Sequence, residues 1–173
     1  TEFYRDLWLF IYFCNGINVA DLINLKFSDI QNGEISFIRE KTKDRTRDTK
    51  RIYAPITPEM QSIIEKWGNN PRKSIYIFPF MKAGDDAWEH EKKKKNLTKH
   101  INDRMKVIGE KLNIGKITTY VARHTYATVL RNEGVPVSII SPMLGHTSIT
   151  TTEIYLADLE SENRARNASL LSF

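Results

Sequence analysis

The second half of the chain reads Tyr120-Val121-Ala122-Arg123-His124-Thr125, then Leu144-Gly145-His146, then Thr150-Thr151-Thr152-Glu153-Ile154-Tyr155. Thr118 or Thr119 is a favourable N-cap, so the first segment is expected to begin a helix that runs to about Glu133 and ends at Gly134. Residues 136–143 predict a short helix that Gly145 stops, and a further helix is expected from about residue 148 through Tyr155. Three helices in succession therefore carry the polar residues of this half.

The first half is expected to begin with helices. Phe3, Leu7 and Cys14 recur at helical spacing, which predicts an amphipathic helix that Asn15-Gly16 ends. Asn18 is then a candidate N-cap for a second helix, with Asp21 three residues later in a capping-box arrangement. The dipeptide Thr57-Pro58 predicts the start of another helix.

A small antiparallel β-element is expected between these helices. Gln31-Asn32-Gly33 is a turn signal, residues 35–42 read as a strand and residues 51–55 as its return. Residues 74–80 resemble a short strand or a buried extended run, and residues 84–95 a polar loop. Apolar residues from Leu97 to Leu112 then predict a strong amphipathic helix. The predicted fold class is mainly α with a small antiparallel β-hairpin or sheet, an α+β arrangement.

The composition suits one domain with a polyanionic partner. The 173 residues are 40% hydrophobic, enough for a single core, and the net charge is +5. Nucleic acid is the first expectation for the partner and an anionic membrane surface the second. The single cysteine, Cys14, excludes an internal disulfide and a cysteine zinc cluster, and no apolar run is long enough to span a bilayer. Without an initial Met or a signal peptide, the chain is expected to be a piece of a larger cytoplasmic protein.

The ordered motifs resemble the tyrosine recombinase (phage-type integrase) family. The shared signature is an arginine-bearing helix, here Tyr120 to Arg123, a Leu-Gly-His turn ending at His146, and Tyr155 nine residues after that histidine. The resemblance covers essentially the whole chain. It implies that residues 1–173 form a single catalytic domain, with an N-terminal DNA-binding domain outside this fragment.

The resemblance implies a role for each motif. Tyr155 would be the nucleophile, and Arg123 and His146 would hold the scissile phosphate, since a guanidinium can bind two phosphate oxygens at once. Lys41 would protonate the departing 5′ oxygen. Double-stranded DNA would be the partner, bound by a homo-tetramer, and no cofactor or metal is implied. The polar tail of residues 157–173 would pack on a neighbouring subunit or, alternatively, fold back on its own core. The basic residues of the hairpin are expected to contact DNA phosphates: Lys43, Arg45, Arg47, Lys50 and Arg51.

Two positions depart from the family pattern. Asn18 stands where the family has its first arginine, and Tyr120 replaces the first histidine of the His-x-x-Arg motif. A variant branch of mobile-element integrases is similar in both respects. Arg39, two residues before Lys41 on the same predicted strand face, is a candidate replacement for the missing arginine. Tyr120 can donate a hydrogen bond but cannot shuttle a proton near neutral pH.

Other interpretations of these residues remain open. Arg123 could form a surface salt bridge, Tyr155 could be one more core tyrosine, and His146 could cap a helix. Lys41 could be an ordinary exposed lysine, and Arg39 could form a cross-strand ion pair within the hairpin. His124 is expected to point away from the site and to be structural. For the whole chain, the alternatives are a catalytically inactive DNA-binding module of the same fold and a helical DNA-binding regulator. A type IB topoisomerase would use similar chemistry.

Overall fold

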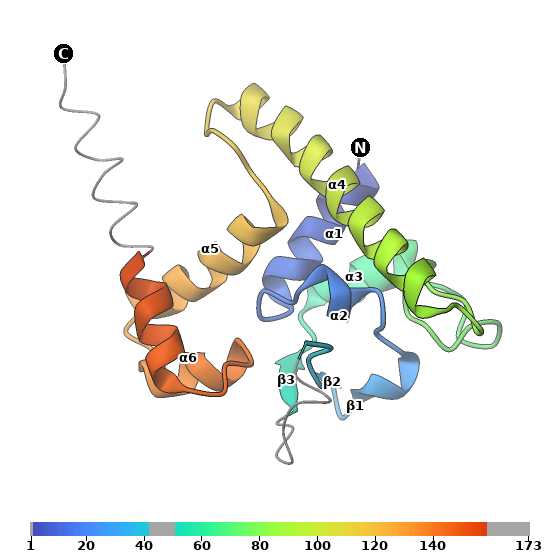
Figure 1. Ribbon diagram of the computed structural model, residues 1–173, viewed down its shortest axis with the longest axis horizontal. Helices are drawn as coiled ribbons and strands as arrows, with labels where there is room; N and C mark the ends of the chain where they lie inside the picture. Colours follow the sequence, from blue (N-terminus) through green and yellow to red (C-terminus); the bar gives the residue numbers. More distant parts are fainter. Residues whose placement is uncertain (1, 42–50, 159–173) are drawn as a thin grey trace.

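The computed structural model describes residues 2–41 and 51–158. Its elements are α1 (Glu2–Phe13), α2 (Val19–Leu22), a 3₁₀ turn (Phe27–Asp29), β1 (Ile30–Gln31), β2 (Glu34–Phe37), β3 (Ile52–Pro55), α3 (Pro58–Trp67), α4 (Ala87–Leu112), α5 (Thr119–Asn132) and α6 (Val137–Met143). A last helix spans 149–158. The protein is mostly helical with one small antiparallel sheet, which confirms the predicted fold class. Figure 1 shows the sheet at one end of the molecule and the long α4 lying across α1.

Local sequence signals fix most helix boundaries. The Thr57 side chain accepts a hydrogen bond from the Met60 amide at 3.3 Å, and Pro58 occupies the first turn of α3, as predicted. Thr118 caps α5 through the Val121 amide in the same way. Asn18 is the N-cap residue of α2, but its side chain makes no capping bond and instead donates to the Asp21 carboxylate. The predicted capping box is therefore wrong.

The sheet has strand order β1-β2-β3, with Ile35 opposite Ala54 and Phe37 opposite Ile52. β2 ends at Phe37, so the prediction that the strand continues through Arg39 and Lys41 is wrong. Glu40 and Lys41 instead lie in a turn. Because the chain leaves the sheet before Arg39, the strand alternation that placed Arg39 and Lys41 on one face does not apply to them.

The predicted polar loop at residues 84–95 is mostly helix. α4 starts at Ala87, because Asp86 caps it by accepting a hydrogen bond from the Glu89 amide at 2.8 Å. Lys93 forms an ion pair with Asp85, which fixes the first turns to the preceding loop. The run is rich in Glu and Lys, which are good helix formers although they give no apolar pattern. The short strand or extended run expected at residues 74–80 is instead a series of bends and a turn, with a single bridge from Tyr76 to Lys26. The prediction that this segment is buried holds for Ile77 and Phe78, which are fully buried.

Two buried apolar clusters hold these elements. The larger joins α1, α2, α3, α4 and the sheet, with Leu7, Phe10 and Ile101 completely buried. The smaller joins α5, α6 and helix 149–158 through Ala127, Ile140, Leu144 and Leu156. α5 packs against both α1 and α6, so it links the two clusters. Among the helices of residues 2–41 and 51–158, none combines the length and apolar character that spanning a membrane requires.

Candidate active site

Arg123 lies on α5 with 7% of its surface exposed. Its Nη1 donates to the Gly16 carbonyl at 2.9 Å and its Nη2 donates to the Leu144 carbonyl. Gly16 has a φ of +63°, and a Cβ there would lie 2.8 Å from the Arg123 Cα. Only glycine lets the two backbones approach this closely, so the turn after α1 fixes where the guanidinium lies.

The turn that carries Gly16 is itself fixed by a side-chain network. Asn15, 4% exposed, donates from Nδ2 to the Tyr53 carbonyl at 2.9 Å and accepts from the Tyr126 hydroxyl at 2.9 Å. Burial raises the pKa of Tyr126 to about 12, so the hydroxyl remains a donor at neutral pH. α5 therefore contacts this turn twice, once through Tyr126 and once through Arg123.

His146 follows Gly145 and its imidazole is held on both sides. Nε2 lies 3.3 Å from Arg123 Nη2, and Nδ1 lies 2.8 Å from the Thr152 hydroxyl. Thr152 is fully buried and is one turn before Tyr155 on helix 149–158. The hydroxyl can donate or accept, so it can satisfy either tautomer of the ring. Thr152 thus links helix 149–158 to His146, a contact that the sequence analysis missed.

Tyr155 lies among three other rings. The ring centroids of Tyr155 and His146 are 5.8 Å apart, those of Tyr155 and His124 5.1 Å, and those of Tyr155 and Tyr120 6.3 Å. The ring centroids of Tyr120 and His124 lie 3.8 Å apart, because residues four apart share a face of α5. The expectation that His124 points away from the site is therefore wrong.

Arg39 reaches this region from the turn after β2. Its Nη1 donates to the Gly145 carbonyl at 2.9 Å. Gly145 has a φ of +66°, and a Cβ there would lie 2.5 Å from Arg39 Cδ. The Leu-Gly-His turn therefore bonds both Arg123 and Arg39 through consecutive carbonyls, those of Leu144 and Gly145.

The cluster is electrostatically positive. Burial, reinforced by the charge of Arg39, lowers the pKa of Arg123 to about 10, which still leaves it protonated at neutral pH. Burial and the two arginines lower the pKa of His146 to about 4, so its imidazole is neutral near pH 7. Two guanidiniums and the donors around them suit an anion, since an anion would relieve the repulsion between like charges.

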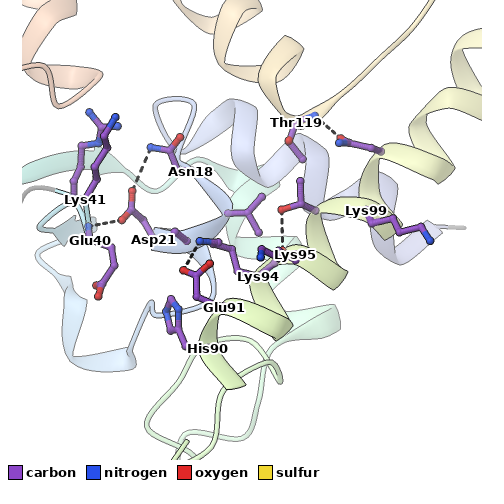
Figure 2. Close-up of a pocket in the computed structure, with 15 residues that line it drawn as sticks. Asn18, Asp21, Glu40, Lys41, His90, Glu91, Lys94, Lys95, Lys99 and Thr119 are labelled. Atoms are coloured by element: carbon purple, nitrogen blue, oxygen red, sulfur yellow. Dashed lines mark hydrogen bonds and ion pairs between the residues drawn. The ribbon is translucent and has the colours of Figure 1, made fainter. Parts of the chain in front are cut away.

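A cavity of about 900 Å³ adjoins this cluster and is lined by α2, the turn at residues 39–41 and α4. Figure 2 shows Asn18, Asp21 and Glu40 on one side and the α4 lysines on the other. Buried Asp21 accepts a hydrogen bond from the Glu40 amide at 2.7 Å, which fixes the turn that presents exposed Lys41 to the cavity. Burial raises the pKa of Asp21, although the hydrogen bonds from Glu40 and Asn18 and the charge of Arg39 act to lower it.

The predicted DNA contacts of the hairpin are only partly described. Lys43, Arg45, Arg47 and Lys50 lie outside the described residues. Arg51 is exposed, and its Nη2 donates to the carbonyl and the hydroxyl of Ser36 at 2.8 and 3.0 Å. These bonds join the start of β3 to β2. The part of the chain that the structure describes holds no group of three or more His, Cys, Asp or Glu side chains suited to a metal ion.

Comparisons with known proteins identify the family of the chain. The model of the phage integrase family matches residues 3–162. The chain belongs to the phage integrase family. The tyrosine recombinase XerA of Pyrococcus furiosus is 30% identical over 154 residues, which are 87% of this chain and 49% of that protein. The chain thus spans about half the length of the curated relatives it matches.

Solved structures of this family share the fold. A XerA recombinase structure matches 94% of this chain and 62% of its own with a TM-score of 0.57 and 21% identity. The XerH recombinase in a post-cleavage complex with palindromic difH DNA matches 97% of this chain and 45% of its own, with a TM-score of 0.60 and 18% identity. A dimer of λ integrase residues 75–356 on a core site matches 88% of this chain and 51% of its own, with a TM-score of 0.51 and 18% identity.

Proposed function

We propose that this chain is the catalytic domain of a site-specific recombinase or integrase that cleaves and rejoins DNA through a 3′-phosphotyrosyl intermediate. One observation carries the proposal: the rings of Tyr155 and His146 are 5.8 Å apart, and His146 Nε2 lies 3.3 Å from Arg123. A phenol next to paired phosphate-binding groups is the arrangement that attack on a phosphodiester requires. Family membership and the DNA-bound relatives support the same conclusion.

The proposed reaction has two reversible halves. The Tyr155 hydroxyl attacks the scissile phosphorus while Arg123 and His146 stabilise the charge that develops on the non-bridging oxygens. Lys41, at the rim of the cavity, gives a proton to the departing 5′ oxygen. A phenolate is a good leaving group, so the 5′-hydroxyl of another strand can reverse the attack. The phosphotyrosyl bond conserves the energy of the phosphodiester, and the proposal therefore involves no metal or ATP.

Arg39 supplies the second guanidinium in this proposal. The position of the family's first arginine holds Asn18, whose side chain is bonded to Asp21. Arg39 instead bonds Gly145, next to the carbonyl that binds Arg123. Its charge also acts on both Arg123 and His146. Arg39 and Arg123 would thus bind one phosphate from two directions, while Tyr120 contributes a hydroxyl at the edge of the site.

Double-stranded DNA is the proposed partner, bound by a homo-tetramer in the cytoplasm. The cavity beside the active site is lined on its α4 side by Lys94, Lys95 and Lys99, which would contact backbone phosphates together with the hairpin lysines and arginines. The tail beyond residue 158, expected to pack on a neighbouring subunit, lies outside the described residues. The relatives bound to DNA as a complex and as a dimer support an assembly on DNA.

Covalent capture tests the proposal without a known target site. The protein is incubated with a library of nicked duplexes of random sequence, and DNA that survives denaturation as a protein adduct is sequenced. We expect adducts with wild-type protein and none with Tyr155→Phe. Binding without any adduct would instead support the inactive DNA-binding module, and neither binding nor adduct would favour a function outside DNA strand exchange.

A matched pair of variants tests Arg39. With a captured sequence as substrate, Arg39→Ala should slow adduct formation by roughly 100-fold or more, as loss of one oxyanion donor does. Arg51→Ala removes a hairpin arginine that bonds only Ser36 in the described residues, and a much smaller loss is expected. Equal mild losses in the two variants would contradict the assignment of Arg39.

A further inference from the structure

The proton of Tyr155 needs an acceptor if the proposed function holds, and the following inference rests on that function. A tyrosine hydroxyl has an ordinary pKa of about 10, so at neutral pH it is protonated and weakly nucleophilic. The proton must leave as the bond from Oη to phosphorus forms. Tyr120, at the position where the family has a histidine, is itself a phenol and cannot accept a proton near neutral pH.

His146 is poorly suited to accept this proton. Its Nε2 faces Arg123 Nη2 at 3.3 Å and its Nδ1 faces the Thr152 hydroxyl at 2.8 Å, so both ring nitrogens are engaged. Burial and two neighbouring guanidiniums lower its pKa to about 4, which makes it a weak base at neutral pH. Because a guanidinium only donates, Nε2 accepts from Arg123 here and could donate to a phosphate only once Arg123 turns to that phosphate. The ring has little tendency to take up a second proton.

His124 is the other imidazole in contact with the nucleophile. Its ring centroid lies 5.1 Å from that of Tyr155 at an interplanar angle of 62°. The ring centroid of Tyr120 lies 3.8 Å from that of His124. Tyr120 contacts its ring from the same helix, and Tyr155 contacts it from helix 149–158. α6, which also packs on α5, has no ionisable side chain.

We infer that His124 is the proton acceptor for Tyr155. During cleavage the Oη–P bond forms and the P–O5′ bond breaks; the phenol proton passes to the His124 imidazole, and Lys41 gives its proton to the 5′ oxygen. During rejoining the imidazolium returns a proton to the departing phenol. Tyr120 packs on the imidazole and orients it. A histidine one turn further along α5 thus takes the proton-handling role that Tyr120 cannot perform.

A substrate with sulphur in place of the 5′ bridging oxygen distinguishes the proton acceptor, His124, from the proton donor, Lys41. A thiolate departs without protonation, so a captured substrate with sulphur in place of the 5′ bridging oxygen no longer needs a proton donor. His124→Gln should slow adduct formation at pH 7 by roughly 100-fold, within the range of general base catalysis, on both oxygen and sulphur substrates. Lys41→Ala should be slow on oxygen and recover on sulphur. His100→Gln, an exposed histidine on α4, should react as wild type on both.

The pH dependence distinguishes a proton acceptor from a packing residue. Without a proton acceptor, the rate of adduct formation follows the fraction of Tyr155 that is phenolate. The rate of His124→Gln should therefore rise about tenfold per pH unit up to pH 9, while the rate of the wild-type protein levels off. Added imidazole should partly restore the variant. A pH-independent loss, recovery on the sulphur substrate or no loss would each overturn the inference. If wild-type protein forms no adduct, the proposed function itself fails.

A probe without DNA covers the case in which His124→Gln does not fold. With 3-fluorotyrosine incorporated, the ¹⁹F resonance of residue 155 should shift with the titration of an imidazole in wild-type protein, and His146→Gln should retain this step. A resonance with no such step, or one that His146→Gln abolishes, would contradict contact between His124 and the nucleophile.

Discussion

Gly16→Ala should damage both stability and cleavage, because it pushes the turn after α1 into Arg123. The new Cβ would lie 2.8 Å from the Cα and Cγ of Arg123 and 2.9 Å from its Cβ. Ordinary contacts begin near 3.4 Å, so the turn and α5 must separate by about half an ångström. A separation of that size also stretches the bond from Arg123 Nη1 to the Gly16 carbonyl.

The stability loss expected for Gly16→Ala has two parts. A φ of +63° costs a non-glycine residue about 1–2 kcal/mol, and overpacking adds roughly 1–3 kcal/mol, so we expect a loss of about 2–5 kcal/mol in the free energy of unfolding. Gly33→Ala is the matched control, since Gly33 has a φ of +78° and nothing within 4 Å of a new Cβ. It should lose only the backbone part, about 1–2 kcal/mol.

Urea denaturation followed by circular dichroism measures both variants. Adduct formation, assayed where each is folded, should fall up to about 100-fold for Gly16→Ala, because an error of about 1 Å in a catalytic group can cost that much. Gly33→Ala should keep its activity. Equal stability losses in the two variants, with normal cleavage by Gly16→Ala, would refute the argument that this glycine positions Arg123.

Three further predictions concern groups around the site. Tyr126→Phe removes the hydroxyl that donates a hydrogen bond to Asn15, and should lower the free energy of unfolding by about 1–2 kcal/mol. Urea denaturation measures this loss, and an unchanged midpoint would show that the bond contributes nothing. Burial raises the pKa of the Cys14 thiol, so iodoacetamide should label it in urea but not in the folded protein, and labelling at equal rates would contradict its burial. The lowered pKa of His146 favours its neutral form in the folded state, so its contribution to stability is complete above pH 6.5 and is lost as the pH falls toward 4. NMR titration should find its imidazole uncharged at pH 5.5, and a midpoint near 6.5 would contradict the placement between Arg123 and Thr152.

The helices and motifs could be predicted from sequence because their signals are local. Thr57, Thr118 and Gly134 mark helix ends through the backbone bonds or conformations of their own turn. The start of α4 was missed because its lysine and glutamate run has no apolar periodicity, although Asp86 gives it a cap. That cap, three residues before Glu89, was the available signal.

The arrangement of the site depends on contacts between distant segments, which the sequence alone does not specify. Arg39 leaves the strand and bonds Gly145, 106 residues away, so strand alternation misplaced it. His124 was assigned away from the site because it follows Arg123, which faces Gly16. Packing of helix 149–158 on the Tyr120 and His124 face of α5 brings Tyr155 to that side. Thr152 was missed because its partner is known only once the turn at His146 is folded.

Mass spectrometry of the trapped protein–DNA adduct tests the account most directly. After nuclease and protease digestion of an adduct made with a captured sequence, we predict one modified peptide, with a nucleotide 3′-phosphate on the oxygen of Tyr155. A nucleotide attached to another residue, or joined through its 5′ phosphate, would contradict the central claim.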